Sequence, residues 1–398
     1  MDDRLRRNVQ FWVKVYTQYP ASQGVIHDAR YIDHVYEVVD VSGHHGMRKA
    51  KESKRKWRAV LSRLHKLSRE GEIDVTQLSP DERHIYELFL DINEPNKFLN
   101  ATHRKRLRFQ LGQRDRFLDG FKQSGRYISA MEEIFIFVGL PTELTRLPFV
   151  ESSFNTRARS KVGASGVWQF MRSTGRLFLK VNDAVDERND PILATQAAAL
   201  LLKLNYEPRN NWPLAVTAYN HGRKGMMRAV RRVGSDELEE LVSEYRSRSF
   251  GFASSNFFTE LLAAIEVERN AERYFGKIDR EAPTEITEVT LPDYIAFKDL
   301  VQFMKMNATD LRVLNPALTE AVFRGERLIP AGYQLRLPVK GATLTAEEGP
   351  KAREEAKQNF LAAYAEIPSL YKLRSQRTQK VAKASTGGRR HRKMSSLD

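Results

Sequence analysis

The most informative stretch of this chain reads PFVESSFNTRARSKVGASGVWQF and runs from Pro148 to Phe170. It contains one acidic side chain, Glu151, followed by a Ser/Asn turn, a basic patch and a glycine-bearing loop, Gly163–Gly166. The loop continues directly into Trp168 and Gln169. A single carboxyl group among apolar residues, with a glycine loop and an amide nearby, indicates a cleft for a polymer with one general acid.

Helix signals before this stretch predict how Glu151 is held. The segment GRYISAMEEIFIF has apolar residues at helical spacing and is soon followed by Gly139, a residue type that commonly ends helices. Pro141 then begins a second helix, which we expect to end near Glu151. Pro148 lies inside this predicted helix and should tighten or kink its last turn. We therefore expect a helix terminus to aim Glu151.

Composition and charge limit the classes of protein to consider. A chain of 398 residues is long enough for two or three domains. The formal net charge is +15, and residues 351–398 account for +8 of it. This predicts attraction to anionic polymers. The sequence has no cysteine, which excludes a thiolate nucleophile, a disulfide and a Cys-based metal site.

The start of the sequence shows no targeting signal. Met1 is followed by charged residues, with no apolar run resembling a signal peptide and nothing near the ~20 apolar residues of a membrane span. Taken alone, this start predicts a cytoplasmic protein. Four histidines lie between His27 and His45, but their spacing matches no known ligand pattern, so we expect no metal site there.

Residues 1–112 are predicted to form an N-terminal helical region. The segment 47–70 contains ten Lys/Arg and two Glu, with apolar residues every three or four positions. This pattern predicts an amphipathic helix whose basic face is solvated or, as an alternative, docks on an anionic surface. Residues 24–41 are irregular or strand-like. Further helices are expected over residues 8–19, 79–92 and 96–111.

Residues 113–280 are predicted to form an all-helical domain of the size of lysozyme, and a different pattern follows. Apolar helices are expected over residues 114–123, 190–205, 212–219, 226–233 and 256–274. Beyond them, EITEVTL and YQLRLPV alternate like strands, and two short helices are expected between them over residues 297–304 and 308–314. The order predicts a small βααβ module over residues 281–340.

The C-terminal segment, residues 341–398, is predicted to be a helix followed by a disordered basic tail. Residues 372–393 contain nine Lys/Arg and no acidic residue. No aromatic side chain is interleaved with these charges to stack on bases. Tethering to an anionic surface is therefore favoured over binding to nucleic acid.

Three motifs, in the same order and spacing, resemble those of a known family. ESSFN from Glu151, GASGVWQFM from Gly163 and AVTAYNHG from Ala215 resemble the motifs of lytic transglycosylases of glycoside hydrolase family 23, most closely the membrane-bound murein transglycosylase D type. The resemblance implies a mainly α fold in which residues 113–280 are a lysozyme-like catalytic domain. It also makes the βααβ module similar to LysM, a glycan-binding unit.

The resemblance implies a specific activity. Lytic transglycosylases cut the β-1,4 bond between N-acetylmuramic acid and N-acetylglucosamine of peptidoglycan without water, and the 6-hydroxyl of the muramic acid attacks its own C1 to form a 1,6-anhydro ring. One carboxyl group, here Glu151, can serve first as acid and then as base. The alternatives are a hydrolytic muramidase on the same fold, a non-catalytic peptidoglycan-binding or scaffold protein, and a basic nucleic-acid binder.

The resemblance also implies the site residues and partners. Glu151 takes the place of the catalytic acid. The substrate-binding positions are Ser160, Gly163, Ala164, Ser165, Gln169, Met171, Tyr219 and Asn220. No cofactor and no nucleic-acid partner are expected. The expected partners are peptidoglycan glycan strands and, for the basic tail, an anionic envelope surface. The implied location is the periplasm or cell envelope, so a leader would have been removed or lie upstream.

Two further expectations concern the acidic residues. Glu151 must stay protonated near neutral pH, and burial against Phe149, Phe154 and the aromatic residues of 168–170 would raise its pKa. The basic residues of 157–161 should then point to the mouth of the cleft. A second catalytic carboxyl could come from the acidic residues of 186–190, but their position just before a proline favours helix capping.

Overall fold

The computed structural model describes residues 3–339, 354 and 358. Contacts between residues divide the chain into two units, which we describe separately. Unit 1 comprises residues 1–155 and 198–281, and unit 2 comprises residues 156–197 and 282–398. Apart from two positions, the predicted C-terminal helix and basic tail lie outside the described residues. The predicted domain boundaries at 112/113, 280/281 and 340/341 remain predictions.

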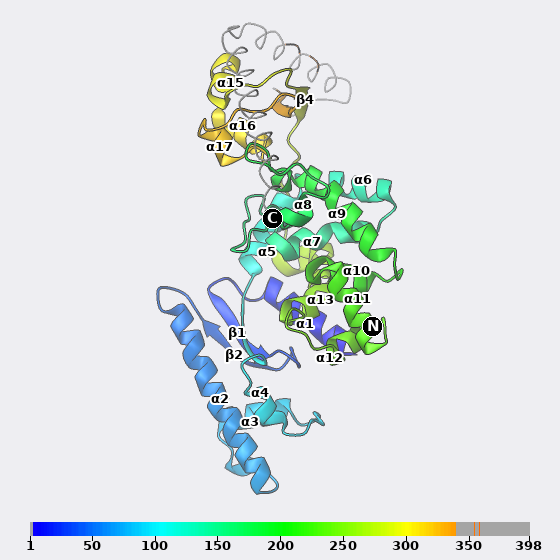
Figure 1. Cartoon of the computed structure of the whole chain (residues 1–398). Helices are drawn as coiled ribbons and strands as arrows, with labels where there is room; N and C mark the ends of the chain where they lie inside the picture. Colours follow the sequence, from blue (N-terminus) through cyan, green and yellow to red (C-terminus); the bar gives the residue numbers. More distant parts are fainter. Residues whose placement is uncertain (1–2, 340–353, 355–357, 359–398) are drawn as a thin grey trace, which may run out of the picture. The chain divides into compact units, whose positions relative to one another are not determined.

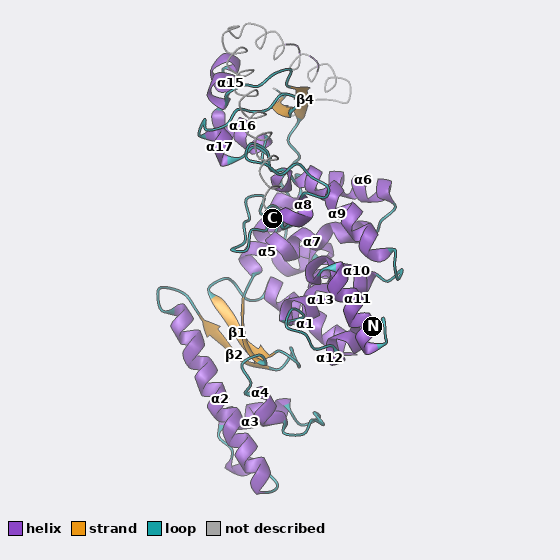
Figure 2. Ribbon diagram, viewed as in Figure 1, coloured by secondary structure: helices purple, strands orange, loops and turns teal. Residues whose placement is uncertain are grey.

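Helices make up most of the described structure, and strands are few and short (Figure 2). The prediction of a mainly α fold is therefore confirmed. Among the described residues, no helix combines the length and the apolar character needed to cross a membrane.

A three-stranded antiparallel sheet lies near the N-terminus of unit 1, in the order β2-β1-β3. Its strands are β1 (Gln23–Asp28), β2 (Val35–Asp40) and β3 (Leu107–Leu111). Val25 pairs with Val38 on one side, and Ile26 pairs with Phe109 on the other. The region that was predicted to be helical thus also contains a sheet.

The basic helix α2 (Gly46–Glu70) packs beside this sheet (Figure 1). Its apolar stripe is buried through Trp57, Leu61 and Leu64, which join a core with Ile26 of β1. The predicted amphipathic helix is therefore confirmed. Two shorter helices and a 3-10 turn complete this part: η1 (Val75–Gln77), α3 (Pro80–Leu88) and α4 (Lys97–Ala101).

The helix expected over residues 96–111 is wrong. The chain forms only the short helix α4 there and then enters strand β3. Phe109 explains the difference, because its ring lies against Gly24 of β1, where an added Cβ would be 2.1 Å from a ring carbon. The pairing partner lies more than 80 residues earlier in the chain, so tertiary contact overrides a weak local preference.

The remainder of unit 1 is a helical bundle around α13 (Phe252–Arg269), on which α1 (Asp3–Thr17), α7 (Leu147–Ser152) and α10 (Trp212–His221) pack. Its other elements are α5 (Arg114–Ser124), α6 (Ile128–Val138), η2 (Thr142–Arg146), α11 (Arg223–Val233), α12 (Leu238–Glu244) and α14 (Ala271–Phe275). The division between the units falls inside α9 (Pro191–Tyr206).

Unit 2 contains the predicted βααβ order. Strands β4 (Ile286–Thr290) and β5 (Gln334–Pro338) pair antiparallel, with Val289 opposite Leu335. Helices α15 (Phe297–Met304) and α16 (Ala308–Leu314) lie between them in sequence, followed by the short α17 (Glu320–Phe323). The order is confirmed, whereas the likeness to LysM remains a prediction. Unit 2 also contains α8 (Arg172–Gly175) and η3 (Glu187–Asn189).

Candidate active site

Glu151 is the second-to-last residue of α7, a helix of six residues. The single kinked helix expected over residues 141–151 is instead two elements, the 3-10 helix η2 and then α7. Pro148 lies in the first turn of α7, where its missing N–H breaks no helical hydrogen bond. The sequence thus starts a new helix at Leu147, four residues before Glu151, and a helix terminus does hold its backbone, as predicted.

The chain turns sharply after Glu151 through two left-handed residues. Ser153 has φ 51° and Phe154 has φ 54°, which is uncommon for residues other than glycine. The Ser153 N–H donates to the carbonyl of Phe149 at 3.2 Å, and the Phe154 N–H donates to that of Pro148 at 3.1 Å. An added Cβ on Gly120 would lie 2.5 Å from the Ser153 carbonyl oxygen. Close packing therefore holds the turn in its strained conformation.

Burial raises the pKa of Glu151 to about 8. The side chain is half-buried, and the fully buried rings of Phe149 and Phe154 meet edge to face at 4.6 Å in the same segment. In the part of the chain that the structure describes, the Glu151 carboxyl has no ion-pair partner. The predicted rise in its pKa is confirmed, and the group is mostly protonated at neutral pH.

Tyr219 lies close to Glu151 in unit 1. Burial raises the pKa of the Tyr219 phenol, and the charge of Glu151 raises it further. The ring stacks on Phe257 of α13 at 6.4 Å between centroids. The next residue, Asn220, accepts a hydrogen bond from the Ser254 hydroxyl at 2.8 Å, so α10 and α13 are fixed to each other at this point.

Glu260 is a second carboxyl of this site that the sequence analysis missed. It lies on α13, one turn after Phe257, and its side chain is half-buried. Burial, and then the charge of Glu151, raises its pKa to about 8. The available signal was a single acidic residue inside the apolar run FFTELLAAI. Unit 1 therefore places Glu151, Tyr219 and Glu260 in electrostatic contact.

The glycine loop belongs to unit 2 and is a closed turn around Ser160. The Ser160 N–H donates to the carbonyl of Ala164 at 2.9 Å, and the Ala164 N–H donates to the Ser160 hydroxyl at 2.9 Å. Gly163 is exposed, with φ 91°. Only glycine adopts this conformation without strain, so the loop presents bare backbone to its surroundings.

Three other predicted positions of unit 2 differ in accessibility. Ser165 is buried, and its hydroxyl donates to the side-chain oxygen of Asn189 at 2.6 Å. Gln169 has φ 48°, and its amide donates to the carbonyls of Ala158 and Gly166 at 3.2 and 2.8 Å. Met171 is 41% exposed. Ser165 and Gln169 thus brace the loop, and Met171 is open to a ligand.

The acidic residues before Pro191 are structural, as predicted. Asp190 accepts hydrogen bonds from the N–H groups of Ile192 and Leu193 at 3.0 Å each, which caps α9. Asp186 forms a two-pronged ion pair with Arg188, with distances of 2.8 and 2.7 Å. Glu187 accepts a hydrogen bond from the Lys180 N–H at 2.6 Å, so each of the three carboxyl groups has a structural partner.

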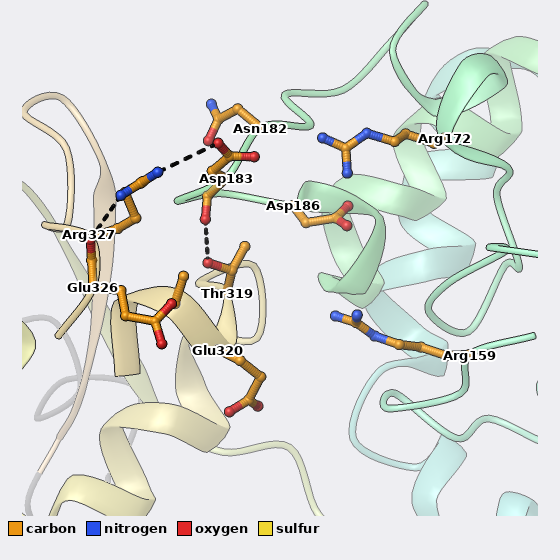
Figure 3. Close-up of a pocket in the computed structure, with 10 residues that line it drawn as sticks. Arg159, Arg172, Asn182, Asp183, Asp186, Thr319, Glu320, Glu326 and Arg327 are labelled. Atoms are coloured by element: carbon orange, nitrogen blue, oxygen red, sulfur yellow. Dashed lines mark hydrogen bonds and ion pairs between the residues drawn. The ribbon is translucent and has the colours of Figure 1, made fainter. Parts of the chain in front are cut away.

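No group of three or more His, Cys, Asp or Glu side chains within the described ranges is arranged to hold a metal ion. Unit 2 does have a polar cavity of about 370 Å³, shown in Figure 3. Arg159 and Arg172 line one side of it, and Thr319, Glu320 and Arg327 line the other. Arg159, one basic residue of the 157–161 patch, is thus exposed and lines this cavity.

Comparison with known proteins gives consistent results for the middle of the chain. Residues 137–242 match the family model described as Transglycosylase SLT domain. Membrane-bound lytic murein transglycosylase D of Escherichia coli (strain K12) is 26% identical over 228 residues, which cover 56% of this chain and 49% of that protein. A protein of Alteromonas sp. (strain M-1), described as a putative tributyltin chloride resistance protein, is 33% identical over 96 residues, covering 24% of this chain and 46% of that protein.

The chain thus spans about half the length of the curated relatives it matches. Among solved structures, an inactive mutant of the lytic transglycosylase Slt from Pseudomonas aeruginosa is 17% identical. The matched region covers 54% of this chain and 37% of the Pseudomonas chain, with a TM-score of 0.31.

Proposed function

We propose that this chain, whose residues 137–242 form a transglycosylase SLT domain, is a peptidoglycan lytic transglycosylase with Glu151 as its acid and base. The observation that carries the proposal is the Glu151 carboxyl, which lies at a helix terminus with a pKa raised to about 8 and forms no ion pair with any of the residues that the structure describes. Most glycosidases need two carboxyl groups, one as acid and one as nucleophile or base. A single group suffices when the substrate supplies its own nucleophile.

The reaction that fits this site returns the enzyme to its starting state. Protonated Glu151 gives its proton to the oxygen of the leaving N-acetylglucosamine as the bond to C1 of N-acetylmuramic acid breaks. The resulting carboxylate then takes the proton of the 6-hydroxyl, whose oxygen bonds to C1 and closes the 1,6-anhydro ring. No water is consumed, and Glu151 is protonated again. A pKa of about 8 favours the first step and still allows the second.

The remaining site residues have supporting roles in this proposal. Tyr219 lies near the carboxyl and can hydrogen-bond to it or to the substrate. The exposed backbone of Gly163 and the side chain of Met171 contact the sugar rings, and the bracing by Ser165 and Gln169 keeps the loop in place. We also propose that the βααβ module is LysM-like and that the protein acts on glycan strands in the cell envelope.

Mass spectrometry of peptidoglycan digests tests the function directly. Purified peptidoglycan is incubated with the wild-type protein, with Glu151→Gln, and with Glu133→Gln as a matched control on the exposed face of α6. We expect the wild type and the control to release fragments lighter by one water than reducing-end muropeptides, and Glu151→Gln to release none.

The outcomes separate the proposal from its rivals. Products with a free reducing end would mean that water, not the 6-hydroxyl, attacks C1. Anhydro products from Glu151→Gln at the wild-type rate would remove Glu151 from the mechanism. A protein that binds peptidoglycan and releases nothing would not be an enzyme of this class.

A further inference from the structure

One loop of the SLT domain contributes to the core of the βααβ module within unit 2. Val185 is only 3% exposed, and it packs with Leu291, Leu318 and Leu335 of the module. It also forms an isolated β-bridge with Leu318. We call residues 183–190 the anchor loop, because its first residues are held by the module.

Backbone hydrogen bonds make the same connection on either side of Val185. The Asp186 N–H donates to the carbonyl of Ala317 at 2.7 Å, and the Thr319 N–H donates to the carbonyl of Ala184 at 3.1 Å. The Thr319 hydroxyl donates to the carbonyl of Asp183 at 2.6 Å, which Figure 3 shows. The anchor loop therefore behaves as an extra edge of the module rather than as a free surface loop.

The other end of the anchor loop reaches the glycine loop through Arg188. Its guanidinium is held by both oxygens of Asp186, and the two side chains are 6% and 7% exposed. The Nη1 atom of Arg188 donates to the carbonyls of Gly163 and Phe170, at 2.9 Å in each case. Arg188 thus connects the start of segment 163–170, at Gly163, with its end, at Phe170.

Backbone packing tightens the same contact. An added Cβ on Gly166 would lie 1.8 Å from the carbonyl oxygen of Arg188, so no side chain fits at that position. Asn189 accepts the hydrogen bond of the Ser165 hydroxyl. The glycine loop therefore contacts the anchor loop at Gly163, Ser165 and Gly166.

A second tether runs from strand β5 of the module. Arg336 pairs with Asp190, whose other oxygen caps α9. Arg336 is itself oriented by Glu288 of β4 at 2.9 Å, and its N–H donates to Asn315 at 2.9 Å. Both ends of the anchor loop are thus fixed by residues of the module.

We infer that Arg188 is a positioning residue of the active site, and that the βααβ module acts as the anchor that holds Arg188 and, through it, the glycine loop in place. The inference rests on the proposed function in one respect, namely that this loop contacts the glycan. A loop that must orient a substrate works best when packing and hydrogen bonds fix it beforehand. The module is then part of the catalytic scaffold, whether or not it binds glycan itself.

Hydrogen exchange of the full chain, followed by mass spectrometry, tests the anchoring without an activity assay. The amides of Gly163, Ser165 and Gly166 are hydrogen-bonded inside the loop, so peptides covering residues 158–171 report its order. Arg336→Gln removes the tether of β5. Arg312→Gln, which removes an exposed ion pair with Glu320 on the same module, is the matched control.

We expect exchange in residues 158–171 to be at least about tenfold faster in Arg336→Gln and unchanged in Arg312→Gln. Leu335→Asp, which places a charge in the core of the module, should have the same effect on the loop or a larger one. Wild-type exchange in residues 158–171 in both Arg336→Gln and Leu335→Asp would overturn the inference. Equal acceleration in Arg336→Gln and Arg312→Gln would overturn it as well.

Steady-state kinetics with Arg188→Gln test the positioning role. We expect KM for glycan to rise at least about tenfold, whereas a loss of folded protein would lower only the apparent kcat. Arg188→Lys should rescue only partly, because an ammonium group cannot replace the two-pronged guanidinium contact. An unchanged KM in Arg188→Gln would overturn the positioning role. If the wild type forms no anhydro product, the proposed function fails, and the exchange experiment still decides the anchoring.

Discussion

Glu151 is half-buried and Asp186 is buried, and the two carboxyl groups have opposite charged surroundings. Asp186 is paired with a guanidinium on both of its oxygens and holds a loop in shape. Glu151 has no ion-pair partner among the described residues 3–339, and burial raises its pKa to about 8. An uncompensated buried acid costs stability, and a protein retains it where the proton is used. The contrast separates the residue that we propose as the catalytic acid from one that holds a loop in shape.

The same change, from carboxylate to amide, should therefore have different effects at the two positions. The largest expected effect is on catalysis by Glu151→Gln. We expect anhydro-product formation to fall by about 10³-fold or more, equivalent to about 4 kcal/mol of barrier, because the proton donor is lost. Its thermal unfolding temperature should not fall below that of the wild type, since the amide needs no deprotonation. A Glu151→Gln variant that is both inactive and strongly destabilised would contradict the contrast with Asp186, because its loss of activity could then come from unfolding.

Asp186→Asn should act on stability. The change leaves the buried Arg188 charge without its partner, which typically costs about 3 kcal/mol or more. We expect a lower thermal unfolding temperature of the purified full chain in a calorimeter, with Glu133→Gln as the control. A melting temperature equal to that of the wild type, together with full loss of activity, would mean that Asp186 acts in catalysis and not in stability.

The pH dependence of activity gives a smaller effect that sharpens the comparison. In the proposed mechanism activity requires protonated Glu151, so the activity should decline as the pH rises through about 8. The titratable groups in electrostatic contact with Glu260 are Tyr16 on α1 and Glu151 on α7. Glu260→Gln removes a negative charge from this site and should shift the alkaline limb to lower pH, by roughly half a unit. If the alkaline decline in activity occurs at the same pH in Glu260→Gln as in the wild type, the two carboxyl groups do not interact.

The same raised pKa values predict how stability changes with pH. The folded state holds protons on Glu151 and Glu260 between about pH 4.5 and 8, whereas the unfolded state has released them. The free energy of unfolding should therefore fall as the pH rises through this window. The melting temperature, measured from pH 5 to 8, should therefore decline less steeply in Glu260→Gln than in the wild type. A steeper decline in the variant would contradict this account.

The smallest effect on stability is expected at an ion pair on the exposed surface of the protein. Arg324 and Glu326 lie 2.7 Å apart on the surface of the module, with more than half of each side chain accessible. Arg324→Gln should leave the melting temperature unchanged within the error of the measurement, because water screens the pair. A melting temperature lowered as much as in Asp186→Asn would show that burial is not what separates the two classes of ion pair.

The sequence allowed much of the site to be predicted where the signals are local. Pro191 marks the start of α9, and Asp190 caps that helix as expected. Pro148 was expected to kink a longer helix, whereas it lies in the first turn of α7. The alternation of EITEVTL and YQLRLPV correctly predicted β4 and β5. Each of these signals depends on residues within a few positions of one another, which is the range over which propensity and capping act.

The features that escaped prediction depend on partners far away in the chain. Strand β3 exists because residue 109 packs against residue 24, and Glu260 matters because it lies near Glu151. Arg188 reads as one more charge in the sequence DERND, and only the folded chain brings it to Gly163 and Phe170. Long-range contact, rather than residue type, gives these positions their roles.

The pairing of Asp190 with Arg336 spans 146 positions of the chain, and this separation has a consequence for biosynthesis. Chains emerge from the ribosome from the N-terminus onward, at about 5–20 residues per second. Glu151, the proposed acid, is therefore synthesised well before the strand that tethers the anchor loop. During those seconds the nascent chain carries its proposed catalytic group without a fixed glycine loop, so we expect a prematurely terminated product to be inactive.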